Sequence, residues 1–202
     1  MYNKIFKRLI DVILSVLLLI LISPLFVLTA LILAAYYRGN PFFTQKRPGL
    51  NENIFLLIKF KSMTEKYDSE GRLLPDGERI TPIGKFIRKT SLDEMPQLFN
   101  VLIGHMSFIG PRPLLVSYIP YYTDREKTRH HVRPGITGLA QVSGRNKLKL
   151  PERLELDAVY VETLSFVNDM KILLQTIRNV ISAKDITVIA SSKTLKDYRS
   201  QP

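Results

Sequence analysis

The sequence predicts an α+β protein that is mostly helical, with an N-terminal membrane helix and a small β-hairpin. Three observations predict this class: a long uncharged run near the N-terminus, later segments with apolar residues at helical spacing, and two β-rich runs around a turn. The chain has 202 residues, no cysteine and a formal net charge of +11. Disulfide scaffolds, Fe–S clusters and cysteine nucleophiles are therefore excluded, and an anionic partner is needed to explain the charge.

The uncharged run extends from residue 12 to residue 37 and is longer than the roughly 20 residues that cross a bilayer. Ser23 and Pro24 lie in its middle, and an internal proline removes one backbone hydrogen bond, so a bend or a break is expected there. Basic residues flank both ends, including Lys7, Arg8 and Arg38, which places both ends on the cytoplasmic side. We therefore favour a re-entrant helix broken at Ser23-Pro24, with a kinked single crossing as the alternative.

Three segments follow from this pattern: a basic flank and membrane helix over residues 1–38, a cytoplasmic domain over 39–190, and a polar tail over 191–202 that we expect to fray. Within the domain, β-rich runs at 42–46 and 53–60 predict a hairpin, because turn-forming residues separate them. Apolar spacing predicts helices over 93–106, 152–164 and 168–186. These amphipathic helices are expected at the membrane surface.

Two adjacent acids, Asp93 and Glu94, open the first of these helices. With Ser91 as the N-cap, Pro96 would fall where its ring clashes, whereas with Asp93 as the cap it lies in the tolerated first turn. We therefore expect Asp93 at the mouth of the helix. Neighbouring helical residues project about 100° apart, so the two carboxylates are expected to have different roles.

Glycines and prolines bracket single arginines in three loops, which contain Arg112, Arg133 and Arg145. A guanidinium on a rigid backbone suits a phosphate, so the loops predict a site for several phosphate groups. The sequence has no P-loop, G-x-G-x-x-G or D-x-D motif, which argues against the usual ATPase, dinucleotide and metal-dependent nucleotide-sugar folds. The histidines lack metal-ligand spacing and are expected to be structural or on the surface; they are His105, His130 and His131.

A series of short motifs, read in order, closely resembles the bacterial sugar transferase family, the monotopic phosphoglycosyl transferases. The match runs from about residue 4 to about residue 183 and covers nearly the whole chain. The motifs are Lys7-Arg8-x-x-Asp11, Ser23-Pro24, the segments 43–49, 59–63 and 91–97, and the loops 110–113, 133–138 and 144–146.

The resemblance implies that a UDP-sugar donates its phospho-sugar to polyprenyl (undecaprenyl) phosphate, giving UMP and a polyprenyl-diphospho-sugar. It makes Asp93 the nucleophile of a covalent intermediate, and it implies that Glu94 helps either to hold Mg²⁺ or to activate the lipid phosphate, with both acids as candidate metal ligands. This reaction is the first membrane step of glycoconjugate or polysaccharide assembly. The resemblance also implies the bacterial inner membrane, its phospholipids and downstream glycosyltransferases as surroundings.

The charges agree with this reading, because an ionised aspartate needs cations to approach a diphosphate. The residues expected to bind phosphate or nucleotide are Lys59, Arg88, Arg112, Arg133 and Arg145, with Asp157 and Asp169 as further contacts or helix caps. At the lipid interface we expect Arg8 to pair with Asp11, and Lys7 and Arg8 to meet headgroups.

One departure from the family pattern is His105, which stands where the family usually has an aspartate. A rival hypothesis is a non-catalytic membrane-surface module that binds anionic lipid or a glycan precursor, and a second is one-step transfer of the sugar alone, which would release UDP. Nucleic acid is not an expected partner, because the basic residues are interleaved with glycine and proline. The motifs do not specify the sugar or the oligomeric state.

Overall fold

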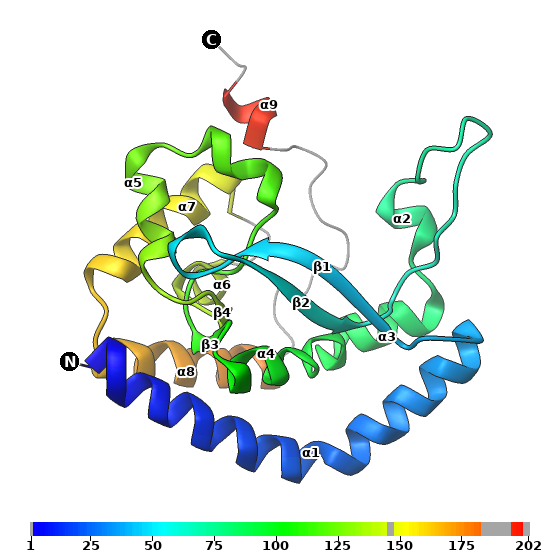
Figure 1. Cartoon of the computed structure of the whole chain (residues 1–202), viewed down its shortest axis with the longest axis horizontal. Helices are drawn as coiled ribbons and strands as arrows, with labels where there is room; N and C mark the ends of the chain where they lie inside the picture. The colour runs from blue at the N-terminus through cyan, green and yellow to red at the C-terminus, as the bar shows by residue number, and fades with distance from the viewer. Residues whose placement is uncertain (1, 145–147, 183–194, 200–202) are drawn as a thin grey trace.

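A computed structural model describes residues 2–144, 148–182 and 195–199 of the chain. It is mostly helical with one small β-hairpin, as the sequence predicts. Figure 1 shows the first helix along one side of the molecule, with the remaining elements gathered above it and the hairpin crossing the middle.

The first helix, α1 (Lys7–Tyr37), is continuous through Ser23 and Pro24, and it changes direction near its middle (Figure 1). Pro24 has no N–H for the carbonyl of Ile20, four residues earlier. The hydroxyl of Ser23 donates a hydrogen bond to this same carbonyl at 2.8 Å. Because the freed carbonyl keeps a partner, the predicted break is a bend in an unbroken helix.

Polar and apolar residues of α1 are arranged in the opposite way to those of a soluble helix. Its buried residues are Lys7, Asp11, Ser15, Thr29 and Leu33, whereas most of its long apolar side chains are exposed. Among the described residues, α1 is the one helix that is long and apolar enough to cross a membrane. An exposed apolar surface of this size marks a surface that contacts lipid or protein.

The predicted hairpin is confirmed. Strand β1 (Phe42–Pro48) pairs antiparallel with β2 (Ile54–Phe60), with Phe43 opposite Lys59 and Arg47 opposite Phe55. The connection contains the 3₁₀ turn η2 (Leu50–Glu52) and two residues with positive φ, Asn51 at 52° and Glu52 at 63°. The turn-forming residues between the two β-rich runs therefore reverse the direction of the chain.

Helix α4 (Gln97–Ile103) covers the outer edge of β2. The side chain of Asn100 donates to the carbonyl of Leu56 at 2.8 Å and accepts from the N–H of Ile58 at 3.0 Å. These bonds satisfy backbone groups that a third strand would otherwise use. The sequence predicted that this helix starts at Asp93, but it starts at Gln97, and residues 92–94 form a separate turn.

A short parallel pair, β3 (Ser107–Ile109) and β4 (Gly135–Thr137), was not predicted. Two glycines allow the close approach of the chains: a Cβ on Gly135 would lie 2.2 Å from the backbone nitrogen of Gly110. Helices α7 (Leu150–Glu162) and α8 (Phe166–Ile181) match two of the predicted helices and close over this pair. The buried cluster between them includes Tyr160 and Ile172.

The remaining elements are short. They are a π-helical turn η1 (Tyr2–Phe6), helices α2 (Asp76–Arg79), α3 (Pro82–Lys89), α5 (Asp124–Lys127) and α6 (Leu139–Ser143), and 3₁₀ turns η3 (Leu92–Glu94), η4 (Val116–Tyr121) and η5 (Thr128–His131).

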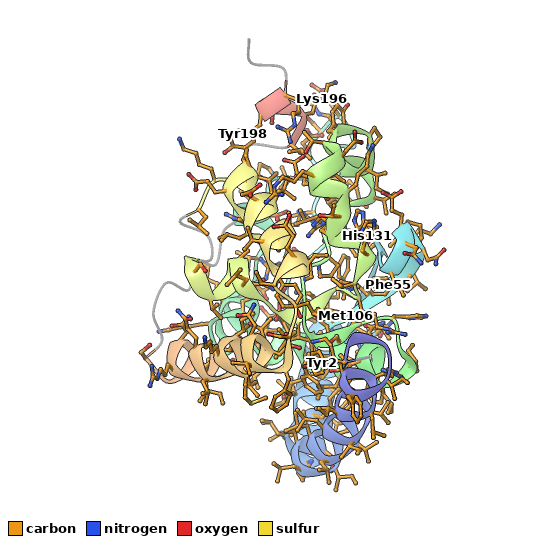
Figure 2. All side chains as sticks on the ribbon, turned by 90° about the vertical axis from the view of Figure 1, so that its left-hand side faces the viewer. Tyr2, Phe55, Met106, His131, Lys196 and Tyr198 are labelled. Carbon is orange, nitrogen blue, oxygen red and sulfur yellow. The ribbon has the colours of Figure 1, made fainter. Side chains whose placement is uncertain are left out.

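The prediction that the polar tail frays is wrong for residues 195–199, which form α9 (Leu195–Arg199). Leu195 is fully buried against Tyr122 and Leu154. Helix α9 lies at the end of the molecule opposite α1 (Figures 1 and 2).

Candidate active site

The two adjacent acids lie in the turn η3, between α3 and α4. Ser91, which precedes the turn, has a left-handed backbone with φ of 58°, so it redirects the chain. The side chain of Asp93 is only 11% exposed and that of Glu94 19% exposed. The carboxylate of Asp93 is therefore nearly buried and lies just before the start of α4, but Asp93 is not the N-cap of that helix.

Strand β2 and the loop after β3 bring cations to these acids. The Nζ of Lys59 lies 2.9 Å from Oε1 of Glu94 and 3.7 Å from Oδ2 of Asp93. The Nη2 of Arg112 donates to the same Oε1 of Glu94 at 2.7 Å. Glu94 is therefore held by two cations, while the 3.7 Å separation leaves the Asp93 oxygen without a hydrogen bond to Lys59.

The two carboxylates differ in proton affinity. Burial raises the pKa of Asp93 above its ordinary value, and the charge of Glu94 adds to this, although Lys59 and Arg112 act in the opposite direction. Burial also disfavours the ionised form of Glu94, but Arg112 and Lys59 outweigh it and hold its pKa well below the ordinary value. Glu94 is therefore a fixed anion, and Asp93 is the more basic carboxylate of the pair.

Arg88, from α3, also lies near Asp93, and its positive charge lowers the pKa of that carboxyl. Its Nε donates to the hydroxyl of Ser62 at 2.9 Å, which holds the guanidinium in place. The structure therefore gathers Lys59, Arg88 and Arg112 around the two acids. These are three of the cations that the sequence assigned to phosphate binding.

Arg133 lies elsewhere. Its Nε donates to the carbonyl of Gly104 at 2.9 Å, just beyond the C-terminus of α4, whereas Asp93 precedes the N-terminus of that helix. Seven helical residues separate the two ends by about 10 Å. Arg145 lies outside the described residues, so its predicted role stays a prediction.

Asp157 and Asp169 are both buried in ion pairs, with basic residues other than those that pair with Asp93 and Glu94. Asp157 pairs with Arg129 at 2.9 Å, and their side chains are 5% and 1% exposed. Asp169 pairs with Lys7 and accepts a hydrogen bond from the hydroxyl of Tyr160 at 2.8 Å. The structure thus gives both acids a place in the packing of the domain, whereas the sequence suggested substrate contacts or helix caps.

Lys7, Arg8 and Asp11, which the sequence places at the lipid interface, all contact the domain. Lys7 is buried in its pair with Asp169. Arg8 donates to the carbonyls of Val101 and Leu102 at 2.5 and 2.7 Å, at the C-terminal end of α4, where a cation is favourable. Asp11 does not join Arg8 in the expected pair but accepts hydrogen bonds from Ser107 and from the N–H of Phe108, each at 3.1 Å. These three residues fasten α1 to the domain.

Two arginines that the sequence did not single out support the Arg112 loop. Arg129 donates to the carbonyl of Arg112 at 2.6 Å, and Arg47 donates to the carbonyl of Pro113 at 3.3 Å. Arg47 belongs to one of the motifs that carried the resemblance, but no local signal marked Arg129.

The donor atoms around Asp93 and Glu94 are suited to a hard divalent cation. Carboxylate oxygens are preferred by Mg²⁺, which usually takes one or two of them and completes its shell with phosphate and water. Within the described part of the chain, no group of three or more His, Cys, Asp or Glu side chains could hold a metal alone. His105 follows the C-terminus of α4, at the opposite end of that helix from Asp93, and its ring lies 5.5 Å from that of Phe55.

Comparison with known proteins places the chain in a family. The family model described as bacterial sugar transferase matches residues 2–183. The sugar transferase EpsL of Bacillus subtilis (strain 168) is 46% identical over 182 residues, which cover 90% of each chain. A UDP-glucose:undecaprenyl-phosphate glucose-1-phosphate transferase of Klebsiella pneumoniae is 42% identical over 87% of this chain, which spans 40% of that relative. The undecaprenyl-phosphate galactose phosphotransferase of Salmonella typhimurium is 36% identical over 89% of this chain and 41% of its own length. The chain therefore belongs to the bacterial sugar transferase family.

Proposed function

We propose that the protein transfers a sugar phosphate from a UDP-sugar to polyprenyl phosphate and releases UMP. The names of the Klebsiella and Salmonella relatives support the two substrate classes and the transfer of a phosphorylated sugar. The observation that carries the proposal is the position of Asp93: a nearly buried carboxylate, raised in pKa, beside an acid that two cations already hold.

In the first step, an oxygen of Asp93 attacks the phosphorus that bears the sugar. The Asp93 O–P bond forms, the P–O bond to UMP breaks, and its electron pair stays on the departing oxygen. In the second step, a phosphate oxygen of the lipid attacks the same phosphorus and releases the Asp93 carboxylate. Lys59, Arg88 and Arg112 reduce the repulsion between a carboxylate and an anionic diphosphate and stabilise charge in the transition state.

Mg²⁺ is part of this proposal. Asp93 and Glu94 would hold it through carboxylate oxygens, and when bound it neutralises charge on the donor diphosphate. Glu94 keeps its charge because of Lys59 and Arg112, so it is available as a ligand throughout the pH range of activity.

The decisive experiment incubates the protein with a panel of UDP-sugars, polyprenyl phosphate and Mg²⁺, and measures the nucleotide released. We expect UMP, and we expect Asp93→Asn to abolish it while lipid binding is kept. Asp124→Asn is the matched control, because the side chain of Asp124 is fully exposed. Release of UDP would instead show one-step transfer of the sugar, and no nucleotide release with any donor would favour the non-catalytic module.

The covalent step has its own test. Without the lipid acceptor, we expect a burst of UMP equal to the amount of enzyme and a phospho-sugar on the peptide that contains Asp93. Turnover without any such adduct would indicate direct attack by the lipid phosphate on the donor.

We further propose that α1 is re-entrant in the inner membrane, with the domain on the cytoplasmic face. Both ends of α1 contact this one domain: Arg8 binds the end of α4, and the hydroxyl of Tyr37 lies 2.9 Å from that of Thr81. The helix bends between these two ends (Figure 1), and the apolar side chain of Leu21, near its middle, is exposed. A straight crossing would carry one end to the opposite side of the bilayer, away from the domain.

Apolar side chains are also exposed on three helices of the domain. They are Phe86 on α3, Phe99 and Ile103 on α4, and Phe166, Val167, Leu174, Ile177 and Val180 on α8. In Figure 1 these helices lie next to α1, on its side of the domain. This common surface supports contact with membrane phospholipid.

The absence of cysteine makes this topology testable by labelling. With single Asn3→Cys and Asn40→Cys variants, we expect a membrane-impermeant maleimide to react with both in inside-out vesicles and with neither in intact cells. Leu21→Cys is the control inside the lipid and should stay unlabelled. Opposite accessibility of the two terminal positions would show a single crossing.

A further inference from the structure

Arg47 lies on the face of the hairpin that also carries Lys59. Cross-strand partners share a face, and β1 places Phe43 opposite Lys59 and Arg47 opposite Phe55. Alternate residues of a strand point to the same side, so Phe43, Gln45 and Arg47 form one row with Lys59 beside its first member. Four residues along the strand correspond to about 13 Å. The row therefore leads from the two acids toward the hairpin turn.

The side chain of Arg47 is fixed but keeps donors to spare. Its Nη2 donates to Oε1 of Gln45 at 2.6 Å, and its Nη1 donates to the carbonyl of Pro113 at 3.3 Å. Its Nε is buried and has no hydrogen-bond partner among the described residues. A guanidinium has five N–H donors, and a buried donor without a partner carries a free-energy cost that a ligand can remove.

Positive charge exceeds negative charge around Arg47 and Arg112. Arg112 is the residue before Pro113, and burial together with the charge of Arg112 lowers the pKa of Arg47 to about 10. Glu94 is already shared between Lys59 and Arg112. In the described part of the chain, Lys59 and Arg112 pair with Asp93 and Glu94, and Arg47 has no ion pair. An added anion that contacts Arg47 and Arg112 would therefore be stabilised.

We propose that Arg47, together with Arg112, binds the phosphate that leaves with the nucleotide. This inference rests on the proposed function and assigns the nucleotide side of the donor to the row on β1. When Asp93 attacks the sugar-bearing phosphorus, the second phosphate must point away from Asp93, and the departing oxygen gains the electron pair of the broken bond. Arg47 neutralises the charge that develops there.

The position of the hairpin agrees with this direction. The Phe42 and Phe60 end packs against Phe26 of α1, with ring centroids of Phe26 and Phe60 5.0 Å apart, while the turn that follows Pro48 lies on the far side of the hairpin from that contact (Figure 1). A lipid acceptor arrives from the side of α1 and a water-soluble donor from the opposite side. The nucleotide therefore extends along β1 toward Arg47.

The test compares Arg47→Gln and Arg47→Lys with Lys46→Gln. Lys46 is exposed and points to the opposite face of the same strand, so it is a matched control. We expect Arg47→Gln to lower kcat/KM for the UDP-sugar about 10- to 100-fold, the range for one hydrogen bond to a charged group. The inhibition constant of UMP should rise by a similar factor, with KM for polyprenyl phosphate unchanged. Arg47→Lys should recover part of the loss, and Lys46→Gln should match the wild type.

The alternative role for Arg47 is a tether between the hairpin and the Arg112 loop. In that case Arg47→Gln would lower Tm and the amount of active enzyme but leave the UMP inhibition constant unchanged, and this result would overturn the inference. An equal rise in KM for the lipid would also overturn it. If Arg47→Gln does not fold, the same constants measured for Arg47→Lys decide. Failure of the proposed function is a separate outcome, because the wild type would then release no UMP.

Discussion

Removal of the Lys7 charge should destabilise the whole protein. The side chains of Lys7 and Asp169 are 8% and 2% exposed, and loss of one partner of a buried pair costs about 3–5 kcal/mol. In Lys7→Met, Asp169 keeps hydrogen bonds from the hydroxyls of Tyr2 and Tyr160, at 2.7 and 2.8 Å, so we expect the lower end, about 3 kcal/mol. For a domain of this size that corresponds to a fall in Tm of about 6–12 °C.

The assay is thermal unfolding in detergent micelles, followed by circular dichroism. Lys171→Met, at an exposed position of α8, is the control and should shift the free energy of unfolding by no more than about 0.5 kcal/mol. The double variant Lys7→Met with Asp169→Leu should recover much of the loss, because no uncompensated charge stays buried. A Lys7→Met variant as stable as the control, or strictly additive losses in the double variant, would refute this reasoning.

Three further predictions concern the site, the metal and the tail. The acid limb of the pH profile of kcat/KM should lie above the ordinary aspartate pKa of about 3.9, because activity needs ionised Asp93 and is lost as pH falls through its raised pKa. Lys59→Met removes a charge that lowers this pKa, so it should move the acid limb to higher pH. An unmoved limb would contradict the assignment. Chelation by EDTA should stop UMP release and leave Tm unchanged, with activity restored by Mg²⁺; a large fall in Tm would instead indicate a structural metal. Leu195→Ala should undock α9, seen as faster hydrogen exchange at residues 195–199, whereas Leu195→Met should not; unchanged exchange would show that burial of Leu195 does not hold the helix.

Local signals were sufficient to predict the hairpin and α7 and α8. Each depends on residue types within a few positions: β-rich runs around a turn cluster, or apolar residues at helical spacing. The start of α4 was missed because the capping argument considered only Ser91, Asp93 and Pro96. In the structure a separate turn brings Asp93 and Glu94 to Lys59, and this tertiary contact is invisible to local rules.

The same limit applies to the candidate site. Arg112 and Arg133 look alike in sequence, since each is next to a proline and two positions from a glycine. In the structure Arg112 reaches Glu94, while Arg133 binds the carbonyl at the end of α4. The pair of Lys7 and Asp169 joins residues 162 positions apart, and a single sequence contains no signal for such a contact. Charge, motif order and resemblance identified the acids and part of their surroundings, whereas the pairing of the other ions needed the fold.

The attachment of α1 at both ends has a mechanical consequence. A membrane helix that is free at one end adapts to a thinner or thicker bilayer by changing its tilt. Here the contacts of Arg8 and Tyr37 with the domain prevent such independent adjustment. If α1 is re-entrant as proposed, a change in bilayer thickness would raise, lower or rock the entire molecule, and lipid composition would set the height of the Asp93 carboxylate relative to the headgroups.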